Sequence, residues 1–188
     1  MIVTKVPAPD GSPEGDRGQA GPVPRTPRPA TPVAELFPEI RSDPDSPSIA
    51  RREVWTDGAC RGNPGPGGWA WALADGRTGS GGERATTNQR MELRAVLEAL
   101  QALDGPLEVV SDSTYVVNCF RDGWWRGWHA RGWVNAKRQP VANRDLWEPV
   151  IELVRAGDVR FRWVKGHGTD PMNDLVDRLA VAASRAVT

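Results

Sequence analysis

Residues 53–74 read Glu53-Val54-Trp55-Thr56-Asp57-Gly58-Ala59-Cys60-Arg61-Gly62-Asn63-Pro64-Gly65-Pro66-Gly67-Gly68-Trp69-Ala70-Trp71-Ala72-Leu73-Ala74. The first five residues, 53–57, predict a β-strand. Residues 62–68 are mostly glycine and proline, which predicts a turn-rich connection. Residues 69–74 predict a second strand. The carboxylate of Asp57 therefore follows the apolar centre of a strand, Val54-Trp55.

The elements predicted further along the chain alternate between strands and helices. A weak third strand is expected near residues 82–85, and Thr86 with Gln89 resembles a capping box that begins a helix ending near Leu103. A strand over 106–111, a helix from Ser113, an irregular or helical segment over 124–144, a helix over 145–155, a strand over 159–164 and a helix from 171 to about 185 follow. This order predicts a mixed sheet flanked by helices.

Glu92 lies one turn into the first predicted helix, on its apolar face. Its helical neighbours at positions +3, +4, +7 and +11 are Ala95, Val96, Ala99 and Leu103. A buried carboxylate without a partner costs several kcal/mol, so Glu92 needs a partner or a cation.

Two more carboxylates occupy positions at which a site can form. Asp112 follows a predicted strand, and open α/β sheets bind ligands at the carboxyl ends of their strands. Asp177 lies in the last predicted helix, one turn before Ala180 and Val181. Each acidic residue alone also fits a structural role: Asp57 could stabilise a turn, and Asp112 or Ser113 could cap a helix. Spacing alone does not bring the four carboxylates together.

Five local motifs resemble those of ribonuclease H, type 1, the bacterial ribonuclease HI family. They occur in the family's order and at similar spacing, from about Glu53 to Ala183. The motifs are Thr56-Asp57-Gly58-Ala59-Cys60-Arg61-Gly62-Asn63-Pro64-Gly65-Pro66-Gly67-Gly68, Thr86-Thr87-Asn88-Gln89-Arg90-Met91-Glu92-Leu93, Ser111-Asp112-Ser113-Thr114-Tyr115-Val116, Trp163-Val164-Lys165-Gly166-His167 and Asn173-Asp174-Leu175-Val176-Asp177.

The resemblance implies an α/β ribonuclease H-like fold, a five-stranded mixed sheet flanked by helices on both sides. It also implies one metal site formed by Asp57, Glu92, Asp112 and Asp177. Hard carboxylate oxygens suit two Mg²⁺ ions, with Mn²⁺ as the alternative, better than zinc. The implied reaction is endonucleolytic hydrolysis of the RNA strand of an RNA–DNA hybrid by a two-metal mechanism, which leaves 5′-phosphate and 3′-hydroxyl ends.

His167 is the fifth residue to which the resemblance assigns a catalytic role. It stands between Gly166 and Gly168, and an imidazole suits proton transfer or help with product release. The chain departs from the common family pattern at Asp170 in the same loop, which puts the behaviour of His167 in doubt. Thr114 replaces a frequent glutamine, so one minor-groove contact is expected to be lost or replaced.

Residues 124–144, called here the basic aromatic segment, contain five Lys or Arg residues, no Asp or Glu, and four tryptophans. Cations attract phosphates and exposed indoles stack on bases. We expect Trp128 and Trp133 to pack internally and Trp124 to contact nucleic acid. Lys137 and Arg138 are candidate phosphate contacts, and the resemblance adds contacts from Asn63, Thr87, Asn88 and Asn143.

Residues 1–50 hold 11 of the 17 prolines and none of the nine tryptophans. This composition predicts a disordered tail before a catalytic domain over 51–188. The patch from Leu36 to Ile40 is either a docking motif or part of a featureless linker, and its partner is unknown.

The remaining composition predicts a cytoplasmic protein that acts as a monomer and does not bind membranes. No apolar run approaches a membrane span, no signal peptide is evident, and Cys60 and Cys119 form no disulfide or metal framework. Lys and Arg total 24, as do Asp and Glu, so the net charge is zero. Nucleic-acid binders are often basic overall, but the local distribution of charge matters more.

Two other functions remain open at this stage. A related nuclease that acts on DNA could share the carboxylates and the fold. A catalytically silent hybrid-binding protein should lack at least one of the four carboxylates, and all four are present.

Overall fold

The computed structural model describes residues 50–166 and 168–187. The predicted proline-rich tail therefore lies outside the described residues, apart from its last position. The described residues form a five-stranded sheet in the order β3-β2-β1-β4-β5. β1 pairs with β2 and β2 with β3 antiparallel, whereas β1 pairs with β4 and β4 with β5 parallel. The strands are β1 (Arg52–Cys60), β2 (Gly65–Leu73), β3 (Thr78–Thr86), β4 (Leu107–Ser111) and β5 (Val159–Trp163).

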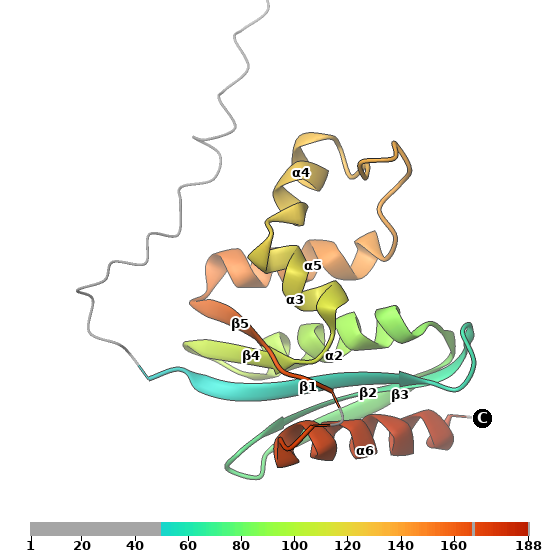
Figure 1. Ribbon diagram of the computed structural model, residues 1–188, viewed down its shortest axis with the longest axis vertical. Coiled ribbons are helices and arrows are strands. Elements are labelled where there is room, and N and C mark those ends of the chain that lie inside the picture. Colours follow the sequence, from blue (N-terminus) through green and yellow to red (C-terminus); the bar gives the residue numbers. More distant parts are fainter. Residues whose placement is uncertain (1–49, 167, 188) are drawn as a thin grey trace, which may run out of the picture. The chain divides into compact units, whose positions relative to one another are not determined.

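Helices cover both faces of this sheet (Figure 1). α6 packs against β1, β2 and β3, and α2 packs against β1 and β2 from the other face, with α5 behind α2. The mixed sheet with helices on both sides, predicted from the sequence, is thus confirmed. The helices are α2 (Asn88–Ala102), α3 (Thr114–Arg121), α4 (Trp124–Ala130), α5 (Arg144–Ala156) and α6 (Pro171–Ala186).

The alternation of side chains along β1 divides the core into two layers. Trp55 faces α6, where it packs with Val110, Val176 and other buried residues. The predicted apolar face of α2 packs on the opposite layer: Ala95, Val96, Ala99 and Leu103 are all buried. Asp57, two residues after Trp55, is on the α6 side of β1, three residues before the strand ends.

Two predicted boundaries were wrong. β2 begins at Gly65, inside the expected turn, because some of its glycines serve helix packing: a side chain at Gly68 would overlap the Ala180 carbonyl of α6. The cap of α2 is Thr87, whose hydroxyl accepts a hydrogen bond from the Arg90 amide at 3.3 Å. Thr86 instead ends β3, because pairing with β2 extends that strand to its position.

Candidate active site

Five acidic side chains line one pocket of about 300 Å³: the four candidate carboxylates and Asp174 of α6. The side chain of Asp57 comes from β1, Glu92 from α2, Asp112 from the end of β4 and Asp177 from α6. The structure therefore brings together all four of the acidic residues that the sequence singled out.

Strand register explains why two of these carboxylates are neighbours. β1 and β4 run parallel, and Trp55 is paired with Val110. Asp57 and Asp112 each follow two residues later, so both emerge at the same edge of the sheet.

Gly58 explains how α2 brings Glu92 to this edge. A side chain at Gly58 would overlap the backbone of Met91 and Glu92, so only glycine allows α2 to approach β1 this closely. The helix can then place the carboxylate of its first turns beside that of Asp57.

Glu92 has two protein partners that the sequence analysis did not assign. The Ser113 hydroxyl donates to Oε2 of Glu92 at 2.6 Å, and the side-chain amide of Asn88 donates to its Oε1 at 2.9 Å. Ser113 also accepts a hydrogen bond from the Val116 amide at 3.3 Å, which caps α3. The partner that a buried Glu92 requires is thus supplied in part by hydrogen bonds from α2 and from the β4–α3 junction.

The electrostatics of the pocket favour a bound cation. The pKa of Asp57 is raised to about 8, chiefly by burial and then by the negative charges of Asp112, Asp177 and Glu92. The Gly58 amide opposes these effects by donating to Oδ1 at 2.8 Å. Burial also raises the pKa of Glu92, against the hydrogen bonds from Ser113 and Asn88.

The donor set fits magnesium or manganese, because hard oxygen ligands and accumulated negative charge are what such ions require. Among residues 50–166 and 168–187, however, no three acidic, histidine or cysteine side chains converge closely enough to form a ready coordination group. Bringing the carboxylates into coordination would therefore require small side-chain movements, which mutual repulsion opposes when no cation is bound.

Sequence reasoning missed Asn173, a buried residue that lines the same pocket. Its amide nitrogen donates to Asp112 Oδ2 at 3.3 Å, and its Oδ1 is buried without a hydrogen-bond partner in the described structure. Asn173 precedes Asp177 by four residues, so the two share a face of α6. That spacing was a signal available in the sequence.

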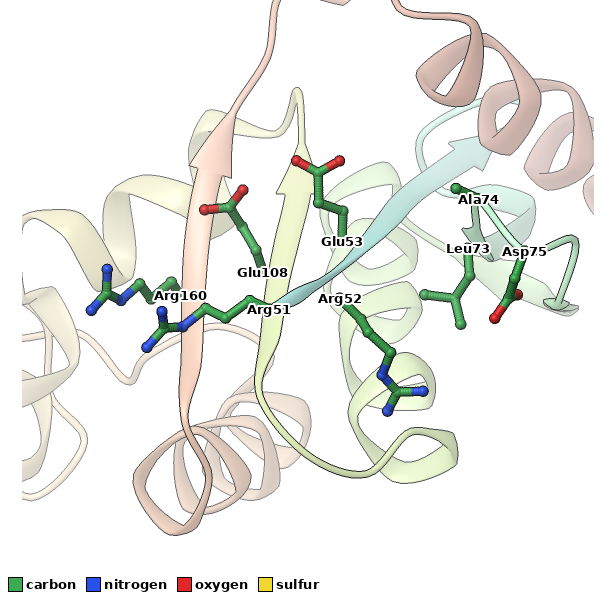
Figure 2. A pocket seen from close by; sticks show the side chains of 8 residues that line it. All are labelled: Arg51, Arg52, Glu53, Leu73, Ala74, Asp75, Glu108 and Arg160. Carbon is green, nitrogen blue, oxygen red and sulfur yellow. The ribbon is translucent and has the colours of Figure 1, made fainter. Parts of the chain in front are cut away.

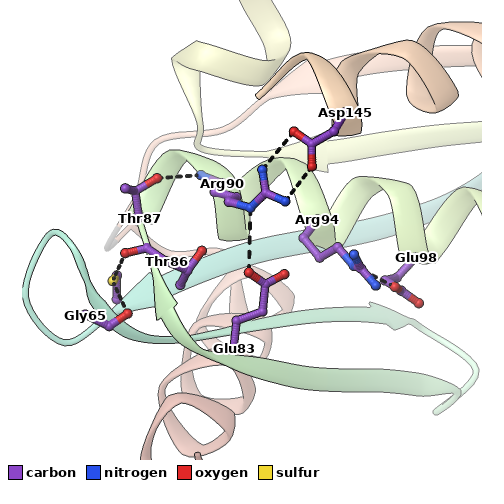
Figure 3. Close-up of polar contacts among 9 residues, drawn as sticks. Gly65, Glu83, Thr86, Thr87, Arg90, Arg94, Glu98 and Asp145 are labelled. Atoms are coloured by element: carbon purple, nitrogen blue, oxygen red, sulfur yellow. Dashed lines mark hydrogen bonds and ion pairs between the residues drawn. The ribbon is translucent and has the colours of Figure 1, made fainter. Parts of the chain in front are cut away.

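Three of the predicted nucleic-acid contacts gather where α2 begins. The backbone amide of Asn88 donates to Asn63 Oδ1 at 3.4 Å, and Thr87 caps the helix. Arg90 fastens this end of α2 to its surroundings through ion pairs with Asp145 at the start of α5 and Glu83 on β3 (Figure 3). Asn63, Thr87 and Asn88 therefore lie at the border of the carboxylate pocket.

The other predicted contacts lie on the basic aromatic segment and at the start of α5. Trp124 and Lys137 line a separate hollow of about 610 Å³ over residues 123–137. Trp124 is 38% exposed. Arg138 is exposed as well. Asn143 directly precedes α5, and its side-chain amide donates to the Tyr115 hydroxyl at 3.3 Å.

The internal packing predicted for two tryptophans of this segment is confirmed. The Trp128 ring lies 5.4 Å from the Trp147 ring, edge to face, and 6.4 Å from that of Trp133.

His167 lies outside the described residues. Gly166 before it lies against the Asp112 carboxylate, so close that a side chain there would overlap it. Asp170, the departure noted in this loop, caps α6 by accepting hydrogen bonds from the amides of Met172 and Asn173 at 2.9 and 3.2 Å. Its role in the structure is therefore to begin the helix that carries Asp177.

A wider hollow of about 650 Å³ lies at the opposite end of the strands (Figure 2). Several of its charged side chains are paired with residues outside its lining: Arg51 binds Asp158 at 2.6 Å, and Glu53 and Glu108 bind Arg162. It holds no convergent set of carboxylates and is not the candidate site.

Residues 50–185 match the family model described as RNase H, and the chain belongs to this family. It is 48% identical to the ribonuclease H of Syntrophomonas wolfei over 140 residues, covering 71% of this chain and 96% of that protein. It is 50% identical to the ribonuclease H of Thermus thermophilus over 141 residues, covering 72% of this chain and 85% of that protein.

A solved structure shares the fold. The chain resembles LC9-RNase H1, described as a type 1 RNase H with the type 2 active-site motif, with a TM-score of 0.63 and 31% identity, over 76% of each chain. The protein is accordingly a ribonuclease H, an endonuclease that acts on RNA–DNA hybrids.

No described helix is both long and apolar enough to cross a bilayer.

Proposed function

We propose that Asp57, Glu92, Asp112 and Asp177 hold two Mg²⁺ ions, or Mn²⁺ in their place, and that cleavage leaves 5′-phosphate and 3′-hydroxyl ends. The observation that carries this proposal is the convergence of the four carboxylates on one pocket of about 300 Å³. The pKa of Asp57, raised to about 8 by burial and by its acidic neighbours, supports it, because a divalent cation would relieve that repulsion.

The bound ions would lower the pKa of the attacking water and stabilise the leaving 3′-oxygen. The chain's own residues orient the carboxylates: Ser113 and Asn88 hold Glu92, and Asn173 holds Asp112. His167, which follows Gly166 in the sequence, accepts or delivers a proton during the reaction or product release.

The hybrid is held by two surfaces. Beside the pocket, Asn63, Thr87 and Asn88 contact the nucleic-acid strands of the hybrid. Glu92 binds a ribose 2′-hydroxyl, the group that distinguishes RNA from DNA. Further from the pocket, the hybrid is contacted by Trp124, Lys137, Arg138 and Asn143.

We further propose that residues 51–188 act as a monomeric catalytic domain in the cytoplasm, with the proline-rich segment before them as an appendage. Both cysteines, Cys60 and Cys119, are free thiols, which suits a reducing compartment.

An end-labelled RNA–DNA hybrid tests this function, alongside duplex DNA and duplex RNA of the same sequence. We expect cleavage of the RNA strand of the hybrid only, with Mg²⁺ or Mn²⁺ and not with EDTA, and phosphatase treatment should show 5′-phosphate ends. Cleavage of duplex DNA would favour the related DNA nuclease, and binding without cleavage would favour the silent hybrid-binding protein.

A further inference from the structure

Asp170 is hydrogen-bonded to a second element besides its own helix. The indole Nε1 of Trp55, on β1, donates to Asp170 Oδ2 at 3.0 Å, while Oδ1 accepts from the first amides of α6. One carboxylate thus joins the strand that carries Asp57 to the helix that carries Asp177. We propose that the Trp55–Asp170 pair is a positioning device that sets the distance between these two carboxylates, an inference that rests on the proposed metal site.

The geometry of each element supports this role. Trp55 and Asp57 are two residues apart on β1, so they are on the same face of the strand. The Trp55 ring is 6% exposed and packs against Val176 and Ala180 of α6, which restrains its rotation. The indole nitrogen therefore has a well-defined position, and its hydrogen bond to Asp170 holds the start of α6.

The pair also connects to Asp112. Asp170 Oδ1 accepts a hydrogen bond from the Asn173 amide, and the Asn173 side chain donates to Asp112 Oδ2. A continuous hydrogen-bonded path therefore runs from β1 through the start of α6 to the end of β4. A shift of α6 along its axis would move Asn173 and Asp177 together, because both belong to the same rigid helix.

Trp55→Phe tests the proposal, because it removes the indole donor and keeps an aromatic ring in the core. We expect the Mg²⁺ concentration for half-maximal activity to rise about tenfold, with the KM for the hybrid within about twofold of the unsubstituted protein. In the metal-free protein, amide hydrogen exchange at Met172 and Asn173 should accelerate, which reports on α6 without reference to activity.

Trp71→Phe is the matched control. Trp71 is also a buried tryptophan, but its pairing with Thr56 places it on the other face of the sheet, away from α6. This variant should lose stability as Trp55→Phe does, yet keep the Mg²⁺ dependence and the exchange at the start of α6.

Variants of Asp170 complete the test. Asp170→Asn keeps one oxygen that can cap α6 but places an amide nitrogen, which cannot accept a hydrogen bond, opposite the indole, so it should keep the cap that Asp170→Ala loses and show the Mg²⁺ dependence of Trp55→Phe. In the double variant with Trp55→Phe, the effect of Asp170→Ala on Mg²⁺ dependence should be smaller than in the unsubstituted background.

Unchanged Mg²⁺ dependence and exchange in Trp55→Phe would overturn the positioning role. Additive effects of the two substitutions would also overturn it. Failure of the unsubstituted protein to require a divalent ion would instead refute the proposed metal site, so the two failures are distinguishable.

Discussion

At the scale of the residue, Asp57 is the acidic side chain of the pocket whose charged form is destabilised most. Its carboxylate is buried, and three other carboxylates contribute to raising its pKa to about 8. Proteins retain such strained charges where function requires them. A residue of this kind should be indispensable for activity and costly for stability, and these two properties can be measured separately.

Asp57→Asn should abolish cleavage and raise the thermal stability of the metal-free protein at neutral pH. The substitution keeps the shape of the side chain but has no proton to lose, so the unfolded chain no longer gains from ionising this group at neutral pH and unfolding should become harder by on the order of 2 kcal/mol. Thermal unfolding in EDTA and cleavage of a labelled hybrid measure the two effects. Substantial Mg²⁺-dependent activity in the folded variant would remove Asp57 from the catalytic role.

Stability should also depend on pH through Asp57. The folded protein binds this proton more tightly than the unfolded chain, whose carboxyl has the ordinary pKa of 3.8. The resulting stabilisation is complete below about pH 4 and is lost as pH rises toward about 8. Stabilisation by Mg²⁺, which binds the deprotonated form, should grow over the same range. Thermal midpoints with EDTA or Mg²⁺ across a pH series would show this, and Asp57→Asn should flatten both trends.

At the scale of the element, close contact between α2 and β1 decides where Glu92 lies. Gly58 permits that contact, and Thr87 begins the helix one residue later than the sequence predicted. The ion pairs of Arg90 with Glu83 and Asp145 then hold the start of α2 (Figure 3). The position of one of the proposed metal-binding carboxylates thus depends on a residue that has no side chain.

Gly58→Ala should therefore lower stability by about 1–3 kcal/mol and reduce cleavage strongly, because the new methyl group would push α2 and Glu92 away from β1. Gly127→Ala is a matched control for stability. The atoms nearest to its methyl group would belong to the guanidinium of Arg131, the far end of a flexible side chain, and alanine is favoured over glycine in a helix by about 1 kcal/mol. Equal stability losses in the two variants, by chemical denaturation, would contradict this account.

The basic aromatic segment should control affinity more than chemistry, since its cations lie outside the carboxylate pocket. Trp124→Ala should cost about 1–3 kcal/mol of hybrid binding, and this loss should persist at high salt. The double variant Lys137→Ala with Arg138→Ala should reduce the slope of log affinity against log salt by about one unit for each lost phosphate contact. Both should raise KM more than they lower kcat.

Hybrid binding in Ca²⁺ across a salt series measures these effects without rapid cleavage. Arg77→Ala, which removes an exposed cation already paired with Asp75, serves as the control and should bind normally. If both test variants bound as tightly as the unsubstituted protein at low salt, the segment would be structural packing only.

At the scale of the whole molecule, the net charge of zero conceals an uneven distribution. The basic aromatic segment holds five cations and no carboxylate, whereas the candidate active-site pocket is lined by several carboxylates. Local fields of opposite sign can therefore attract a polyanion at one surface and a divalent cation at another. The neutral total, which counted mildly against a nucleic-acid binder, does not conflict with the function of the family.

Deleting residues 1–50 should leave turnover on short hybrids within about twofold and the thermal midpoint nearly unchanged, because proline-rich termini rarely contribute to a core. The match to the family model over residues 50–185 is consistent with this expectation. A large fall in either quantity would show that the segment belongs to the fold or the site.

The elements and most candidate residues were predictable because their signals are local. Apolar periodicity identified the face of α2 that is buried, and the position of Asp112 after a strand placed it at the ligand-binding edge. Caps were found to within one residue, since competing strand pairing decides such boundaries. Four of the five proposed catalytic residues were thus located as members of elements, each visible in a short stretch of sequence.

Only the tertiary structure decided which of these residues meet. Glu92 and Ser113 are separated by 21 positions, and Trp55 and Asp170 by 115. No local pattern specifies such contacts, because they depend on strand register, on the close approach that Gly58 allows and on how α6 packs against β1. Hydrophobic periodicity and capping act within a few residues, whereas a site assembled from four elements exists only after those elements have packed.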